Sequence, residues 1–562
     1  MEKEHLGGTC LNVGCIPTKT LFQSAEVANT VRESARYGIG SALTGVDFPA
    51  VMRRKDGVVK QLVNGVGYLL KKNKVDFLPG EAKLLSASEV KLGGKVYRTR
   101  NILIATGSSN AAPPIPGLKG ERVIDSTQLL ALKTLPKSMV IIGGGVIGCE
   151  FASILAAFGC KITVVEMLPH LLGGMDRSLA DAVARQFTDA GIQVELGARV
   201  KSVCDQGMEQ AVVFEKNGAE GTVSAEYVLV STGRKANSAG LGCEELGIRM
   251  ERGFIQVDSH MRTSVPGIYA AGDITGQGML AHTASEGGVV AVENMAGIDR
   301  ELRLNAVPKV VFVDKEVASV GMTREEAEAA FALALDARQE RVRAALNKLA
   351  SDPPQVLILE GGSVAERFSV ALWHAARLNC PEGRPPCLHC PACLQIGANL
   401  FHDLYVLDGR EGSIKIETVR ELRTILGEAP RGDGKRVVIL AEAQSLGVEA
   451  ANALLKSLEE PRPGVCFLLL APQRERLLPT LVSRGWVVTL AWPEAGTPST
   501  PELFQWEEAL AEFMASGQGW LDKTSGKGAV DAALARRIVL SVQKAQAALH
   551  AGRDGGPLGR RL

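Results

Sequence analysis

Two hydrophobic patterns divide the chain near residue 330. Before it, short apolar runs end at glycine-rich turns: Met139–Ile142 meets the spacing G-x-G-x-x-G, a stretch of helical period follows, and a second apolar run ends at Glu166. This order predicts strand, turn, helix and strand. After it, residues 331–351 carry an apolar pattern of helical period that stops at the breaker Asp-Pro-Pro. We therefore expect a domain boundary between residues 325 and 352.

The second half alternates apolar runs with helical segments. A strand is predicted at 355–362, a helix at 363–378, and further strands at 403–409, 436–444 and 464–472. Strands that alternate with helices predict a parallel sheet with crossover connections, so both halves of the chain read as α/β.

The turn after Met139–Ile142 has the chemistry of a dinucleotide site. Gly143, Gly145 and Gly148 allow a tight turn and close approach of a pyrophosphate, which the N-terminus of the next helix would hold. Glu166 stands where a carboxylate accepts hydrogen bonds from a ribose 2′-hydroxyl, which favours NAD over NADP. The alternative is a plain tight β–α turn.

Two cysteines near the N-terminus form a second candidate. Cys10 and Cys15 are too close in sequence to close a useful structural loop. Pairs at such spacing cycle between dithiol and disulfide, one thiolate attacking the substrate while the other faces the electron carrier. Two reduced cysteines on a helix are the alternative, and the presence of a nucleotide motif later in the chain favours the redox role.

Composition narrows the class of protein. The 562 residues predict two to four domains, and 63 Lys and Arg against 62 Asp and Glu give no overall basic field for nucleic acid or membrane. Glycines, Glu150 and Lys161 interrupt the longest apolar stretch, and no signal peptide is recognised, so a cytoplasmic protein is expected. Five isolated cysteines are expected to be buried thiols: Cys149, Cys160, Cys204, Cys243 and Cys466.

The first 330 residues resemble the flavin-dependent pyridine nucleotide–disulfide oxidoreductases of the dihydrolipoamide dehydrogenase type. Five motifs carry the resemblance in order: GGTCLNVGCIPTK at 7–19, ILIATGS at 102–108, the G-x-G-x-x-G turn, STGRKAN at 231–237 and GIYAAGDITGQGMLAHTASEGG at 267–288. The resemblance implies FAD and NAD as cofactors, a small-molecule or lipoyl-type disulfide as substrate, and a homodimer.

The same resemblance assigns roles to single residues. Cys10 would exchange with the substrate disulfide, Cys15 would lie against the flavin, and Lys19 would sit near its reactive nitrogen. Gly107, Gly233 and Asp273 would contact the cofactors. From the residues alone, Asp273 is equally a helix cap, and the ring of His282 is expected to pack rather than to line the cofactor.

Two departures from that family bear on activity. The family places its FAD fingerprint some thirty residues before the redox pair, where this chain has nine residues. The family's dimerisation domain, with its His and Glu acid/base, begins here at 307–330 and is not recognisable afterwards. Whether the chain is an active enzyme is therefore left open, because loss of a general acid/base alone costs about 10²–10⁴-fold.

The second half contains a four-cysteine module. Cys380, Cys387, Cys390 and Cys393 have the spacing C-x6-C-x2-C-x2-C, with proline and glycine turns that bring four soft ligands together. A closed set of four thiolates is typical of a structural zinc site. His389 could replace one ligand, and a reduced thiol cluster is the alternative.

Residues 351–493 resemble the delta-prime subunit of the bacterial DNA polymerase III clamp loader. The module, DGREGSIKIETVREL, AEAQSLGVEAANALLKSLEEP and LLPTLVSRGW carry the resemblance. The turn GGSVAERFS lacks G-K-[ST], and Glu442 replaces a metal-binding aspartate, so nucleotide hydrolysis is not expected. By resemblance Arg484 would be an arginine finger for a neighbouring ATPase subunit, with at most indirect DNA contact; from the residue alone it is a surface arginine in a turn.

The expected fold is a Rossmann-like flavoprotein fragment with two dinucleotide-binding domains, followed by a RecA-like AAA+ domain with a zinc module and a C-terminal helical segment. The preferred function is an FAD- and NAD-dependent dithiol/disulfide oxidoreductase fused to a clamp-loader domain. A non-catalytic clamp-loader subunit and an inactive chimera of two gene fragments are the alternatives. The expected domains are a partial FAD domain at 1–124, an NAD domain at 125–250, the second FAD part at 251–306, a dimerisation stub at 307–330, a junction at 331–350, the clamp-loader domain at 351–493 and a partial helical domain at 494–562.

Overall fold

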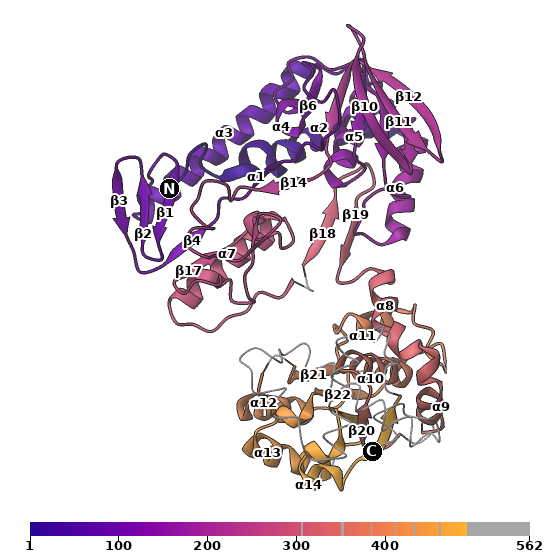
Figure 1. The fold of residues 1–562 in the computed structure, drawn as a ribbon. Helices are drawn as coiled ribbons and strands as arrows, with labels where there is room; N and C mark the ends of the chain where they lie inside the picture. Colours follow the sequence, from indigo (N-terminus) through magenta and orange to yellow (C-terminus); the bar gives the residue numbers. More distant parts are fainter. Residues whose placement is uncertain are drawn as a thin grey trace, which may run out of the picture. The chain divides into compact units, whose positions relative to one another are not determined.

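The computed structural model separates into two compact units, one of residues 1–323 and one that begins at Arg324 (Figure 1). The residues that it describes are 1–304, 307–349, 353–383, 385–410, 412–431, 434–459 and 462–491. The helical segment expected at 494–562 lies outside them. Among the described residues, no helix is both long and apolar enough to cross a membrane.

A five-stranded parallel sheet is the centre of the first unit. Its order is β6-β13-β7-β8-β9, with bounds Val123–Asp125, Tyr227–Val230, Ser138–Ile142, Lys161–Glu166 and Gln193–Leu196. Helix α5 (Val146–Phe158) connects β7 to β8, and α6 (Arg177–Asp189) connects β8 to β9. Met139, Val140 and Ile141 of β7 are fully buried. The predicted strand, turn, helix and strand are confirmed.

A three-stranded antiparallel sheet corrects one expectation about the cysteines. Strands β10 (Ala198–Asp205), β11 (Gln210–Lys216) and β12 (Ala219–Ala225) pair in sequence order. Cys204 of β10 is exposed, not buried as expected, because side chains alternate along the strand and its neighbour Val203 takes the inward position. The other four isolated cysteines are buried.

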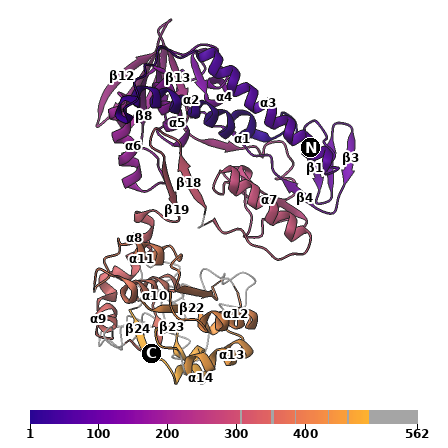
Figure 2. The same ribbon diagram turned by 180° about the vertical axis from the view of Figure 1, so that it is seen from behind.

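A short helix and the start of a long one carry the N-terminal motif. The short α1 (Gly8–Val13) leads into α2 (Cys15–Glu33), which runs beside α3 (Phe48–Lys72) (Figures 1 and 2). Leu21, Phe22 and Ala25 on one face of α2 join the core that also holds buried residues of α5. This contact packs α2 against α5, the helix that follows the glycine-rich turn of the parallel sheet.

Smaller sheets complete the first unit. Strand β4 (Ile102–Ile104) pairs in parallel with β17 (Ile268–Ala270), and β5 (Ser108–Asn110) pairs with β14 (Arg234–Ala236). The turn η2 (Asp273–Thr275) and α7 (Ala281–Met295) follow β17. The remaining elements are η1 (Ser34–Tyr37), β1 (Ala82–Ser86), β2 (Glu89–Leu92), β3 (Lys95–Arg98), α4 (Ser126–Leu129), β15 (Met250–Glu251) and β16 (Phe254–Ile255).

A hairpin, β18 (Pro308–Val311) and β19 (Val317–Val320), belongs to the first unit and packs through its tip against helices of that unit. The amide of Gln186 donates to the carbonyl of Lys315 at 2.9 Å and accepts from its N–H at 2.8 Å. The rings of Phe22 and Phe312 meet edge to face at 5.8 Å. The tip therefore lies against α2, α5 and α6.

The second unit is built on a five-stranded parallel sheet of order β21-β22-β23-β20-β24. The strands span Leu404–Asp408, Arg436–Ala441, Val465–Ala471, Val356–Gly361 and Trp486–Leu490. The four predicted strands are confirmed, and edge strand β24 was not predicted. The helices are α10 (Val364–Asn379), α11 (Pro391–Gly397), α12 (Ile416–Leu426), α13 (Val448–Glu459) and α14 (Pro479–Val482), with turns η5 (Ala443–Ser445) and η6 (Arg474–Arg476). β20, β22 and β23 contribute buried residues to two core clusters.

The helical pattern at the boundary forms two helices. Helix α8 (Arg324–Leu335) ends where Asp336 caps the turn η4 (Ala337–Gln339), and α9 (Glu340–Lys348) follows. The hydroxyl of Ser369 on α10 donates to the carbonyl of Ala330 at 2.7 Å and accepts from the N–H of Ala334 at 3.0 Å. These contacts place α8 in the second unit and the division at Thr323/Arg324, just before the range expected from the sequence.

Candidate functional sites

The N-terminal cysteines lie side by side across a sharp turn. Cys10 is in α1 and Cys15 begins α2; the turn at Gly14 is so tight that a Cβ there would lie 2.9 Å from the carbonyl oxygen of Thr9. A hydrogen bond from the Cys10 thiol, aided by the Lys19 ammonium, lowers the pKa of Cys15 to about 6, whereas the same bond and partial burial raise the pKa of Cys10. At neutral pH the reduced pair therefore carries a thiolate on Cys15 and a thiol on Cys10.

Lys19 is held by a partner that the sequence analysis did not assign. Its Nζ lies 2.7 Å from each carboxylate oxygen of Glu150 on α5, and the N–H of Phe312 donates to the same carboxylate at 3.2 Å. The Glu150 side chain is only 5% exposed, so its charge depends on these donors. Lys19 also lies 4.5 Å from the centroid of the Phe312 ring. A lone acidic residue in the apolar run of α5 was the signal that could have identified Glu150.

The glycine-rich turn between β7 and α5 is shaped by close backbone approach. A Cβ on Gly143 would lie 2.6 Å from the carbonyl oxygen of Ser231, and one on Gly148 would lie 2.0 Å from that of Gly143. A Cβ on Gly145 would meet no atom of the described chain within 4 Å, so this glycine leaves open space at the N-terminus of α5. In dinucleotide sites, a pyrophosphate binds at this position, the N-terminus of the helix that follows the glycine-rich turn.

Glu166 lies at the end of β8 beside this turn. Its two carboxylate oxygens accept the N–H groups of Gly144 at 2.5 Å and Leu168 at 2.7 Å. Each oxygen keeps a further lone pair, so the fixed carboxylate can also accept from a ribose hydroxyl. The structure thus brings Gly143, Gly145, Gly148 and Glu166 together as the sequence predicted.

The remaining predicted cofactor residues gather around β5 and β14. Asp273 accepts a hydrogen bond from the hydroxyl of Ser108 at 2.5 Å, and Nε of Arg234 lies 3.6 Å from it. The backbone of Gly107 and Gly233, both at positive φ, accepts from Asn237 and Ala111 at 3.0 Å. Gly272, not Asp273, occupies the N-cap position of the turn η2, so the alternative of a helix cap is not supported.

Two polar atoms after η2 fit a bound polar cofactor. Oε1 of Gln277 and Oγ1 of Thr283 are buried and have no hydrogen-bond partner within the described residues. Buried polar groups normally find a partner, so a ligand with hydrogen-bonding groups suits this position. The ring of His282 is exposed and bonds the carbonyl of Pro308 at 3.0 Å, which corrects the expectation that it packs, because its side of α7 faces outward.

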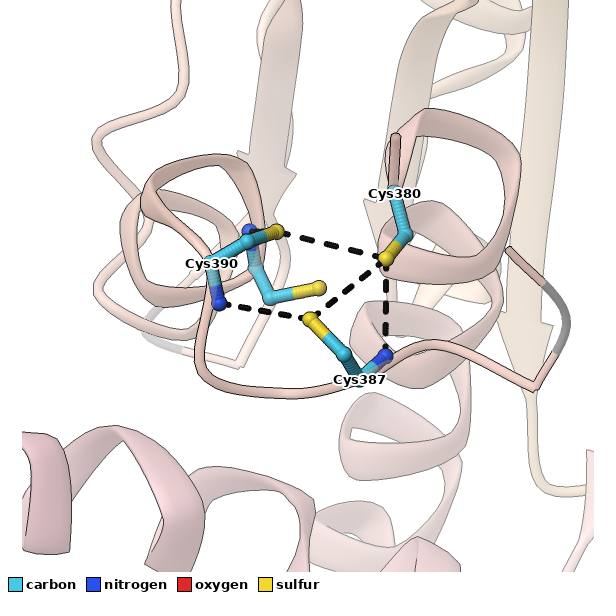
Figure 3. Close-up of side chains that lie close together, drawn as sticks. Cys380, Cys387 and Cys390 are labelled. Carbon is cyan, nitrogen blue, oxygen red and sulfur yellow. Dashed lines mark hydrogen bonds between the residues drawn. The ribbon is translucent and has the colours of Figure 1, made fainter. Parts of the chain in front are cut away.

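The four cysteines of the second unit converge after α10 (Figure 3). Sγ of Cys380 lies 3.6 Å from that of Cys387 and 4.0 Å from that of Cys390, and all four sulfur atoms, with that of Cys393, lie within 4.8 Å of one another. Backbone N–H groups of Cys387, Cys390 and Cys393 point at neighbouring sulfurs at 3.3–3.5 Å. This donor set and spacing fit a tetrahedral zinc ion. His389 lies outside the set and pairs with Glu382 at 3.1 Å.

The turn after β20 is occupied by the positively charged side chain of Arg367. The guanidinium of Arg367 donates to the carbonyls of Gly361 and Gly362, both at 2.9 Å, and to Glu442 at 2.6 Å. Arg367 is 2% exposed. A phosphate-binding loop presents N–H groups, whereas this turn presents carbonyls to a buried guanidinium, in agreement with the absence of G-K-[ST].

Arg484 lies at an open hollow of about 350 Å³ lined by Pro354, Gln355, Val356, Leu458, Glu459 and Trp486. One guanidinium nitrogen donates to the carbonyl of Thr480 and the hydroxyl of Ser483, and the other pairs with the carboxylate of Glu459. Glu459 is a second residue that the sequence analysis did not assign.

A hydrogen-bonded cysteine pair next to Lys19 and the buried Glu150, in a unit that also contains a dinucleotide-type turn, defines a flavoprotein disulfide oxidoreductase. Residues 2–288 match the family model described as pyridine nucleotide-disulphide oxidoreductase, and the chain belongs to that family. The dihydrolipoyl dehydrogenase of Acholeplasma laidlawii is 46% identical over 303 residues, 53% of this chain and 88% of the relative. That of Geobacillus stearothermophilus is 40% identical over 333 residues, 58% and 70% of the two chains.

Solved structures agree with this assignment for the first unit. A copper(II) complex of the HOCl-induced flavoprotein disulfide reductase RclA from Escherichia coli has a TM-score of 0.52 and 32% identity, covering 58% of this chain and 72% of that one. A second family model, described as DNA polymerase III, delta subunit, matches residues 339–494. Both resemblances noted in the sequence are confirmed.

Proposed function

We propose that the first unit is an NAD-linked dithiol/disulfide oxidoreductase acting on a lipoyl-type substrate. The cysteine geometry carries this proposal: Cys10 on α1 and Cys15 at the start of α2 form a hydrogen-bonded pair, and the Lys19–Glu150 pair lies one helical turn further along α2. The names of the relatives support the substrate class.

The chemistry of the pair has a direction. A substrate thiolate attacks Sγ of Cys10 in the Cys10–Cys15 disulfide, the S–S bond breaks, and Cys15 leaves as the thiolate. The second substrate thiolate then attacks the substrate sulfur of the mixed disulfide, releasing Cys10 and the oxidised substrate. Two electrons and two protons leave the substrate; the electrons reach the cysteines and the protons go to Cys10 and to solvent. The lowered pKa of Cys15 supports its role as leaving group.

The other groups hold the pair and the cofactors. FAD, when bound, would supply a two-electron carrier between the cysteine pair and NAD⁺. Gly107, Gly233 and Asp273 would hold the flavin nucleotide, and Gly143, Gly145, Gly148 and Glu166 would hold NAD. Lys19, fixed by Glu150, keeps a positive charge near Cys15 and thereby favours its thiolate.

The test is turnover of dihydrolipoamide by the full chain supplied with FAD and NAD⁺, followed as NADH absorbance at 340 nm. We expect activity that falls about 10³-fold or more in Cys10→Ser and Cys15→Ser. Cys204→Ser removes an exposed thiol outside the site and should leave the rate unchanged. Turnover that persists in the Cys10→Ser/Cys15→Ser double variant would refute the proposal.

A second function is proposed for the second unit, favoured by its match to the clamp-loader family. The strand order, in chain order 5-1-4-3-2 across the sheet, supports a RecA-like AAA+ fold, and the four cysteines support a structural zinc. Arg484 is proposed as an arginine finger for a neighbouring ATPase subunit. Arg367 occupies the turn after β20, where a nucleotide phosphate would otherwise bind. This unit would therefore assist nucleotide hydrolysis by a neighbouring subunit rather than perform it.

A further inference from the structure

The two terminal nitrogens of the Arg484 guanidinium have different kinds of partner. One guanidinium nitrogen is fixed to the chain's own α14, through Thr480 and Ser483, so the group has a defined place. The other nitrogen pairs with Glu459, the last residue of α13. The Glu459 side chain is 48% exposed. An exposed ion pair contributes little to stability, so this second contact is exchangeable while the first stays.

The surroundings suit a multiply charged anion. The hollow opens beside the guanidinium and has an apolar wall of Pro354, Val356 and Leu458. Trp486 at its rim is 64% exposed, which is unusual for so large an aromatic side chain. A phosphate offers a guanidinium two parallel charge-assisted hydrogen bonds and more charge than one carboxylate.

We propose that Glu459 is a latch on Arg484: it holds the guanidinium in the hollow until a terminal phosphate of a polyphosphate chain displaces it. The inference rests on the proposed arginine-finger role, in which that phosphate belongs to a nucleotide held by a neighbouring subunit. Glu459 is thus a positioning residue, and Trp486 lies where it reports the exchange.

Tripolyphosphate titrated into the full-length protein at low ionic strength, followed by tryptophan fluorescence, tests the latch. We expect Glu459→Gln to bind about fivefold more tightly than the wild type, because the competing charge is gone. Glu449→Gln makes the same charge change at the other end of α13 and should have no effect. The fluorescence response should disappear in Trp486→Phe.

Dependence on Arg484 decides the outcome. Arg484→Ala should bind weakly, and Arg484→Ala/Glu459→Gln should bind no better than Arg484→Ala. Equal affinities of wild type and Glu459→Gln, or a gain that persists without Arg484, would overturn the latch.

Stimulation of a bacterial clamp-loader ATPase subunit separates the latch from the finger. If Arg484→Ala lowers that ATPase and Glu459→Gln neither raises it nor tightens tripolyphosphate binding, the finger stands and the latch is refuted. If the tripolyphosphate pattern holds while Arg484→Ala leaves the ATPase unchanged, the latch stands as a site for free polyphosphate and the finger fails.

Discussion

At the scale of single residues, the protonation state of the Cys15 thiol can be tested directly. Its pKa is lowered to about 6 by the Cys10 hydrogen bond and by Lys19, so it is a thiolate above that pH. Alkylation of reduced protein by iodoacetamide, followed at the Cys15 peptide by mass spectrometry, should rise through a midpoint near pH 6. In Cys10→Ala the donor is lost, and the midpoint should move toward about 8.5, the value of a free thiol.

The peptide that contains Cys204 gives an internal reference in the same digest, because that thiol is exposed and lies on β10, away from the pair. A Cys15 profile that is identical in wild type and Cys10→Ala would show that the hydrogen bond does not control this thiol.

The site residues that could be predicted from the sequence belong to motifs of closely spaced residues, in which the spacing itself indicates the chemistry. Cys10 and Cys15, the three glycines with Glu166, and the four cysteines are all brought together within their motifs. Glu150, Arg367 and Glu459 were not assigned, because each acts through a partner distant in sequence or through a backbone turn. The Lys19–Glu150 contact, for example, joins residues 131 positions apart.

At the scale of elements, the turn between β7 and α5 separates two roles of glycine. Gly148→Ala should lower the stability of the first unit by about 1–3 kcal/mol, because its Cβ would lie 2.0 Å from a carbonyl oxygen. Gly145→Ala meets no atom and should leave the melting temperature unchanged, yet weaken NADH binding by obstructing the pyrophosphate position.

Calorimetry and NADH titration of the two variants distinguish these roles. Loss of stability in Gly145→Ala, or unchanged stability in Gly148→Ala, would contradict the assignment.

Elements with a clear hydrophobic period and flanking glycines were predicted correctly. Strand β24 was not, because a short edge run such as Trp486–Leu490 is only recognisable once it pairs with β20.

At the scale of the whole molecule, the second unit contains a buried base that should make it acid-sensitive. His374 is fully buried, and neither ring nitrogen has a partner within the described residues. Burial, with Arg377 nearby, lowers its pKa to about 3. Below about pH 6.5, His374 binds a proton in the unfolded chain but stays neutral in the folded unit. The free energy of unfolding therefore falls by about 1.4 kcal/mol per pH unit toward pH 3.

Hydrogen exchange of α10 amides, corrected for intrinsic rates, measures this in the intact chain. His374→Met should show a shallower loss of opening free energy between pH 6.5 and 4, while the cysteine module, common to both proteins, cancels in the comparison. Parallel pH profiles of the two proteins would exclude His374 as the acid-sensitive group.

The order of strands in the second unit has a consequence for biosynthesis. Central strand β20 pairs with β23, Val356 opposite Phe467, so its partner is synthesised more than a hundred residues later. At about 5–20 residues per second, the ribosome exposes this apolar segment unpaired for about 5–20 s. Such a strand is a template for association with other nascent chains. Production of this protein should therefore depend on chaperone capacity, and that dependence should grow when translation is slowed, because the unpaired interval becomes longer.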